Sequence, residues 1–179
     1  MNPQEKNTYV RKQITKALIS LMGRKKINDI SISELCDKAQ VGRASFYRNY
    51  DSKEEVIRHH TEALINGWAD EIDRDPSASI SSFFQSLFQH FQKNQSFYKI
   101  LYRQNMSTTI LAAIRSRLNM DKDIGLSSLY ARAFTAYGIF GWIDVWFSNG
   151  MKETPEELNR IIVENLNKII IGAKSVDTL

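Results

Sequence analysis

The residues best placed to do chemistry lie between positions 42 and 53, and their types suit binding to a polyanion. Gly42-Arg43-Ala44-Ser45 combines small side chains, which allow close approach, with one guanidinium that can bond the acceptor pair of guanine. Tyr47 offers a phenol and Lys53 an ammonium, and both groups donate hydrogen bonds to phosphate oxygens. Together they predict contacts to nucleic-acid bases and backbone.

No comparable arrangement favours catalysis or metal binding. The single cysteine, Cys36, is expected to be a small buried residue, and it cannot form an internal disulfide. His59 and His60 are adjacent and cannot face the same way on a helix, and His90 stands alone. Without a nucleophile-base pair, metal-ligand spacing or a phosphate-binding glycine loop, we expect no enzyme activity, no metal and no cofactor.

Short helices are needed to position these side chains. Ser33 is a suitable N-cap for a helix ending near Ala39, residues 40–42 make a tight turn, and a second short helix covers residues 43–49. Two short helices joined by such a turn can place one helix in a major groove while the other braces it. A helix over residues 3–24 precedes the pair, and a long helix over residues 53–73, capped at Ser52, follows it.

The rest of the chain has the spacing of further helices. A break at Asp75-Pro76-Ser77 is followed by an apolar face at offsets of 3, 4, 7, 8 and 11 from Ile80. Further helices are expected around residues 97–103, 108–119 and 123–149, and a last one starts at Pro155 with Thr154 as cap. The sequence predicts an all-α fold of about nine helices, with a head at residues 1–55 and a second domain at residues 56–179.

Charge and composition limit the class of protein further. Residues 1–55 hold 11 Lys and Arg against 7 Asp and Glu, whereas residues 56–179 hold 13 of each, so the net charge of +4 lies in the head. The chain is 42% hydrophobic, which is ample for a packed core. No apolar run approaches the roughly 20 residues of a membrane span, and the first 16 residues are mostly polar, so we expect a cytoplasmic protein without membrane contact.

The segment from Ile30 to Ile57, ISISELCDKAQVGRASFYRNYDSKEEVI, resembles the DNA-binding signature of the TetR family. The signature has an aromatic-Tyr pair, another aromatic residue and a Ser-Lys-Glu run, which here are Phe46-Tyr47, Tyr50 and Ser52-Lys53-Glu54. The resemblance implies that Gly42, Arg43, Ala44 and Ser45 face bases and that Ser33, Tyr47, Asn49 and Lys53 contact phosphates. The family usually has Gly where this chain has Gln40 and Ser where it has Gly42, so Gln40 is strained if its φ is positive.

The C-terminal part more loosely resembles one branch of the same family, which includes repressors and the activator of dihydroxyacetone kinase genes. The order Tyr137-Gly138, Gly141-Trp142, Trp146, Gly150-Met151 and Pro155-Glu156-Glu157-Leu158 carries this resemblance. It implies that the last two helices of two chains form a four-helix bundle. Candidate residues of this dimer interface are Trp146, Leu158, Ile162, Leu166 and Ile169.

Aromatic residues in the second domain have two interpretations. They can pack the core, or some of them can line a pocket for a small apolar or aromatic effector, as in many members of the family. The candidates for the pocket are Trp68, Phe84, Phe88, Tyr102, Tyr137 and Trp142.

We therefore expect a homodimeric regulator that binds a near-palindromic site in double-stranded DNA, acts as a repressor and is released by an effector. A helical interaction or ligand-binding protein that has lost DNA recognition through the changes at Gln40 and Gly42 is the alternative. A small all-α enzyme is a third hypothesis, which the residues support least.

Overall fold

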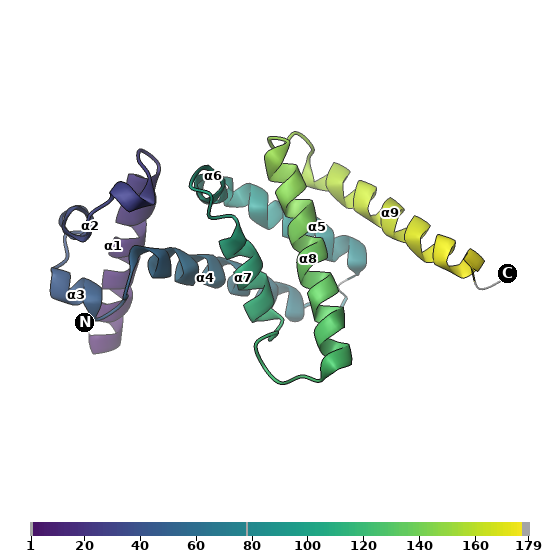
Figure 1. The fold of residues 1–179 in the computed structure, drawn as a ribbon, viewed down its shortest axis with the longest axis horizontal. Coiled ribbons are helices and arrows are strands. Elements are labelled where there is room, and N and C mark those ends of the chain that lie inside the picture. The colour runs from purple at the N-terminus through teal and green to yellow at the C-terminus, as the bar shows by residue number, and fades with distance from the viewer. Residues whose placement is uncertain (1, 78, 177–179) are drawn as a thin grey trace. The chain divides into compact units, whose positions relative to one another are not determined.

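The computed structural model describes residues 2–77 and 79–176, and for residue 3 and residues 167–176 it describes the backbone alone. Within these residues the chain forms nine α-helices, one 3-10 turn and no strand, which confirms the predicted all-α fold (Figure 1). In chain order these are α1 (Pro3–Met22), η1 (Ile27–Asp29), α2 (Ile32–Ala39), α3 (Arg43–Tyr47), α4 (Lys53–Asp73), α5 (Ile80–Lys93), α6 (Gln95–Arg103), α7 (Thr108–Arg117), α8 (Leu126–Ser148) and α9 (Pro155–Val176). No helix in the described part of the chain is long and apolar enough to cross a membrane.

The chain divides into two compact units. The first comprises Met1–Asn66 and Ser96–Phe140, and the second comprises Gly67–Gln95 and Gly141–Leu179, so α4 and α8 each run through both. The domain boundary predicted at residue 55 remains a prediction.

The first unit contains the N-terminal helices. Successive turns of α1 bury Ile14, Leu18 and Met22, of which none is more than 2% exposed. Helix α1 packs against α2, which in turn contacts α3 (Figure 1). Leu35 of α2 is also fully buried. The three-helix head is small and has little surface to bury, so burial of these apolar side chains is its main source of stability.

Polar side chains set where the helices begin. Asn2 and Thr154 form capping boxes with Glu5 and Glu157, in which each side chain bonds the other residue's backbone N–H. The cap predicted at Ser33 is wrong, because the Oγ of Ser31 accepts the Glu34 N–H at 3.1 Å and α2 starts two residues earlier. The two serines are only two residues apart, and serine is a good cap at either position, so composition alone did not distinguish them.

In the second unit, α5 packs along α9. The apolar face predicted for α5 is confirmed over most of its length, since Leu87, Phe88 and Phe91 are at most 1% exposed, but Ile80 at its start is 65% exposed. Polar pairs flank the contact, with Gln85 donating to Glu156 at 2.7 Å and Asn159 donating to Ser81 at 2.9 Å. The sequence-predicted amphipathic helix therefore finds its partner in the last helix of the chain.

Candidate nucleic-acid interface

The turn between α2 and α3 depends on a left-handed residue. Gln40 has φ 55° and ψ 42°, so the positive φ considered at this position is confirmed. Its backbone N–H and that of Val41 bond carbonyls in the last turn of α2, the latter reaching Cys36 at 3.0 Å. This pattern ends α2 sharply and turns the chain into α3.

The short helix α3 has one buried and one exposed face. Phe46 is completely buried and Tyr50, just beyond the helix, is 4% exposed, so both belong to the core. Arg43 and Ala44 are exposed, and Tyr47 is 52% exposed. The guanidinium and the phenol that the sequence singled out therefore lie on the open side of a helix whose other side is anchored.

Gly42 occupies the N-cap of α3 in an extended conformation, with φ −71° and ψ 148°. A Cβ added there would meet no atom within 4 Å, so neither backbone conformation nor space requires glycine. No side chain caps α3, which leaves its first backbone N–H groups without the bond that the family's usual serine would make. Gly42 thus leaves the N-terminal end of α3 open to close approach by another molecule.

Hydrogen bonds between α3 and the two residues that follow it restrict several of the candidate polar groups. The Ser45 hydroxyl accepts from Arg48 at 2.8 Å, and Asn49 donates through Nδ2 to the Ser45 carbonyl at 2.8 Å. The Oδ1 of Asn49 is buried without a hydrogen-bond partner, and as an acceptor it cannot bond a phosphodiester oxygen. The remaining N–H of Asn49 is the group that suits a phosphate.

Arg48 is a candidate that the sequence analysis missed. It is exposed at the C-cap of α3 and its guanidinium is oriented by Ser45. The sequence could have indicated this contact, because Arg48 comes three residues after Ser45 and residues three apart lie on one face of a helix.

Lys53 has a different environment from the one predicted. Its Nζ donates to the carbonyl of Ile27 at 2.7 Å and to that of Ile30 at 2.6 Å, which joins the start of α4 to η1. An ammonium has three donors, so one is left for a phosphate. The main contacts of Lys53 are therefore structural, because they hold the start of α4 to η1. Ser33 is exposed on the first turn of α2, where a hydroxyl can meet a phosphate.

Cys36 is buried in α2, and burial raises the pKa of its thiol, with the Arg43 charge opposing that shift. The thiol therefore stays protonated at neutral pH and has the low reactivity of a packing residue.

The first part of the chain matches the family model described as bacterial regulatory proteins, tetR family, over residues 14–59. A second model, described as transcriptional regulator C-terminal region, matches residues 78–168, which is half of the chain. The chain belongs to the TetR family. It is a DNA-binding transcriptional regulator with a helix-turn-helix head and a helical C-terminal regulator region.

Solved structures share the TetR-family fold at low sequence identity. Lin0861 from Listeria innocua is 18% identical with a TM-score of 0.74, and the match covers 94% of this chain and 95% of that one. The dihydroxyacetone kinase operon activator DhaS is 20% identical with a TM-score of 0.55, covering 92% and 96%. FadR from Bacillus subtilis in complex with stearoyl-CoA is 16% identical with a TM-score of 0.53, covering 85% and 95%. A comparison with curated proteins finds no match.

Four of the six aromatic residues predicted to line a pocket belong to the second unit and take part in aromatic contacts there. Trp68 donates to Ser86 at 2.9 Å and its ring lies against Phe83. Phe84 contacts Trp142 with ring centroids 4.9 Å apart, and Phe88 contacts Trp146 at 5.3 Å. The other two belong to the first unit, namely Tyr102, which is half-buried, and Tyr137, which is 50% exposed and accepts from Arg115 at 3.0 Å.

The predicted dimer residues differ in the surface they offer. Trp146 and Ile162 are only 2% and 4% exposed, because they pack within the chain, so they offer a partner almost no surface. Leu158 and Leu166 are partly buried, and the side chain of Ile169 lies outside the described residues. The broad apolar surface is on α8, where residues at offsets of 4, 8, 11 and 19 from the first are half or more exposed. We call these residues the α8 stripe: Leu126, Tyr130, Phe134, Tyr137 and Val145.

Proposed function

We propose that this regulator is a repressor that binds a near-palindromic operator as a homodimer. The observation that carries the proposal is the open face of α3, where Arg43 and Tyr47 project from a helix held by the buried Phe46. Arg43 reads a base edge and Tyr47, with Ser33 and Asn49, contacts phosphates. Gly42, Ala44 and Ser45 allow the approach of α3 to the bases, and repression follows from occlusion of the promoter.

The α8 stripe supports the homodimer. Four of its aromatic and aliphatic side chains, from Leu126 to Tyr137, are 50% to 82% exposed and spaced one turn apart. An exposed apolar row of this kind is typical of an interface. Ile161 of α9 is also 43% exposed. We propose that two chains pair through α8 and α9, which sets the spacing of the two recognition helices at about 34–36 Å for successive major grooves.

We propose a small apolar or aromatic effector that binds beside the aromatic rings of the second unit. The FadR structure contains stearoyl-CoA, which makes a long-chain acyl group one candidate for the apolar part of such a ligand. Such a ligand releases DNA only if it binds the non-binding conformation better than the DNA-bound one.

Mobility-shift assays with fragments from the regulator's own genomic neighbourhood test the proposal, at two salt concentrations and with random DNA as competitor. A single fragment that stays bound in the presence of competitor supports an operator-binding regulator. Binding that is weak on every fragment and disappears with salt would leave only an electrostatic interaction with DNA and would favour the interaction-protein alternative.

A further inference from the structure

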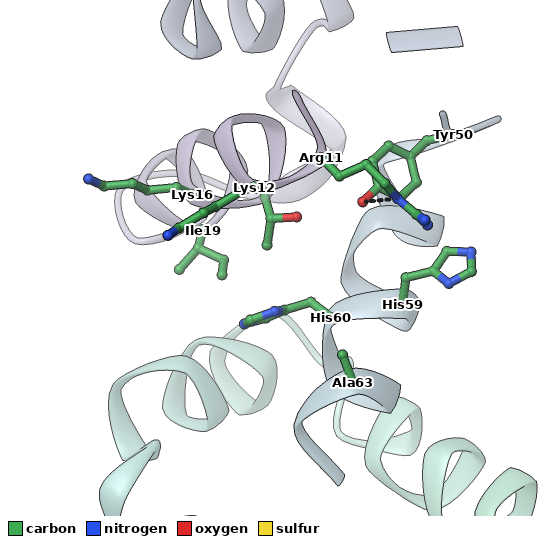
Figure 2. Close-up of a pocket in the computed structure, with 9 residues that line it drawn as sticks. Arg11, Lys12, Lys16, Ile19, Tyr50, His59, His60 and Ala63 are labelled. Carbon is green, nitrogen blue, oxygen red and sulfur yellow. Dashed lines mark hydrogen bonds between the residues drawn. The ribbon is translucent and has the colours of Figure 1, made fainter. Parts of the chain in front are cut away.

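A groove lies between α1 and α4, entirely within the first unit and apart from the exposed face of α3. Its volume is about 660 Å³, which is in the range of roughly 300–1,000 Å³ that small-molecule sites occupy. Figure 2 shows side chains of α1 along one side and those of α4 along the other. Neither the DNA-binding role nor the aromatic residues of the second unit account for it.

The charge of the groove has one sign. Arg11, Lys12 and Lys16 contribute three cations from α1, and among the described residues that line the groove none carries a carboxylate. Lys12 and Lys16 are four residues apart, so their ammonium groups share one face of α1 and repel each other. Both are exposed, and no hydrogen bond or ion pair joins either to another described residue.

Two carboxylates beside the groove already have partners. Glu55 and Glu62 lie beside His59 at 3.4 Å and 3.8 Å, but Arg58 pairs with both, at 3.4 Å and 3.0 Å. Arg11 is held in place by a 3.3 Å hydrogen bond to the hydroxyl of Tyr50, with its guanidinium over the ring (Figure 2). One cation held against Tyr50 and two exposed cations therefore border the groove.

The other surfaces of the groove are apolar or aromatic. Ile19 and Ala63 contribute aliphatic carbons from the two helices. The imidazole of His60 stacks edge-on to Phe97 with ring centroids 4.7 Å apart, and burial lowers its pKa. A neutral imidazole presents its ring faces and a single N–H donor. The site therefore suits a ligand with an apolar body and an anionic end.

We propose that this groove binds an amphipathic organic anion, a carboxylate or phosphate ester on an aromatic or short aliphatic body. The anionic end lies against Lys12, Lys16 and Arg11, and the body lies over Ile19, Ala63 and the His60 ring. Such a ligand bridges α1, which packs on α2, and α4, which follows α3. It would make the groove a second effector site, separate from the aromatic residues of the second unit.

The three histidines allow a site-specific test, because His59 and His60 line the groove whereas His90 belongs to the second unit. The full chain, labelled with ¹⁵N-histidine, is titrated at pH 7 with 2-naphthoate, and the imidazole signals are followed by NMR. We expect saturable shifts of His59 and His60 with His90 unmoved. The uncharged 2-naphthamide, which has the same shape, should bind about tenfold more weakly or not at all.

Lys12→Gln with Lys16→Gln should weaken 2-naphthoate binding about tenfold, while the matched pair Lys122→Gln with Lys152→Gln, which removes the same charge elsewhere, should not change it. Equal binding of the acid and the amide, or equal effects of the two pairs, would overturn the proposal. A shift of His90 alone would also overturn it, because the compound would then bind in the second unit. Shifts of His59 and His60 that only duplex DNA produces would overturn it too, because the groove would then belong to the DNA interface. None of these readouts requires the protein to bind an operator.

Discussion

At the scale of single residues, the helix-turn-helix carries a conformational cost at Gln40. Its backbone is left-handed, a conformation that costs an L-residue other than Gly about 1 kcal/mol or more. This cost was predictable, because the family usually has glycine there. The role of Lys53 was not predictable from the sequence, since its two carbonyl partners are 26 and 23 residues away and depend on how η1 packs.

Gln40→Gly should raise the free energy of unfolding by about 0.5–1 kcal/mol, because glycine adopts positive φ without a steric penalty. Urea denaturation measures it. The matched replacement Gln13→Gly, inside α1, should instead lower the free energy of unfolding by about 1 kcal/mol. Destabilisation by both replacements would contradict strain at Gln40.

His90 should make stability depend on pH. Burial lowers its pKa to about 4, with the charge of Lys93 adding to the shift. The unfolded chain therefore binds a proton more readily, and the free energy of unfolding falls as pH drops from about 6.5 towards 4, by roughly 2–3 kcal/mol. Burial shifts the pKa of His60 in the same direction.

Urea denaturation at several pH values, with wild type and His90→Gln compared, isolates this contribution. The variant should lose less stability between pH 6.5 and 4. Parallel curves for the two proteins would mean that His90 is not held neutral in the folded state.

At the scale of elements, the end of α6 is tied to the end of α1. Gln104 accepts from the Ile27 N–H at 3.1 Å and donates to the carbonyls of Met22 and Lys25, both at 2.9 Å. Lys26 adds a 2.7 Å bond to the carbonyl of Arg103. The helices themselves were predictable from apolar spacing and caps. These hydrogen bonds were not, because they join residues some 80 positions apart and no local sequence pattern predicts them.

Gln104→Ala should lower the free energy of unfolding by about 1–3 kcal/mol, because it leaves partly buried backbone groups without partners. Chemical denaturation measures the change. Gln89→Ala, on the exposed side of α5, is the control and should change stability by less than about 0.5 kcal/mol. Equal, small effects at both positions would show that the α1–α6 connection contributes little.

The α8 stripe shows another limit of sequence interpretation at this scale. Apolar residues surround α8 on all sides, so periodicity marks no single face and the stripe was not distinguished from the core. Burial in the folded chain separates the two sets: Ala136, Ile143 and Trp146 are at most 2% exposed, whereas Phe134 is 82% exposed. Of the predicted dimer residues only Trp146 lies on α8, and it belongs to the buried set.

At the scale of the whole molecule, the proposed dimer depends on that stripe. Phe134→Asp should abolish dimerisation with little effect on the fold of each chain, because the side chain is 82% exposed. Sedimentation equilibrium should show a mass near 20.7 kDa for the variant and about twice that for wild type. Ile80→Asp, which changes an apolar residue that is 65% exposed on α5, should remain dimeric. A Phe134→Asp variant that stays dimeric would place the interface elsewhere.

The central claim is that the open face of α3 reads DNA sequence, and the specificity ratio of Arg43→Ala tests it most directly. The ratio is the dissociation constant for random DNA divided by that for the operator fragment, measured at one salt concentration. We predict that it falls about tenfold or more in Arg43→Ala and is unchanged in Arg160→Ala, which removes the same charge from α9. An Arg43→Ala protein that loses affinity equally for both DNAs would contradict the account, because Arg43 would then contribute charge alone.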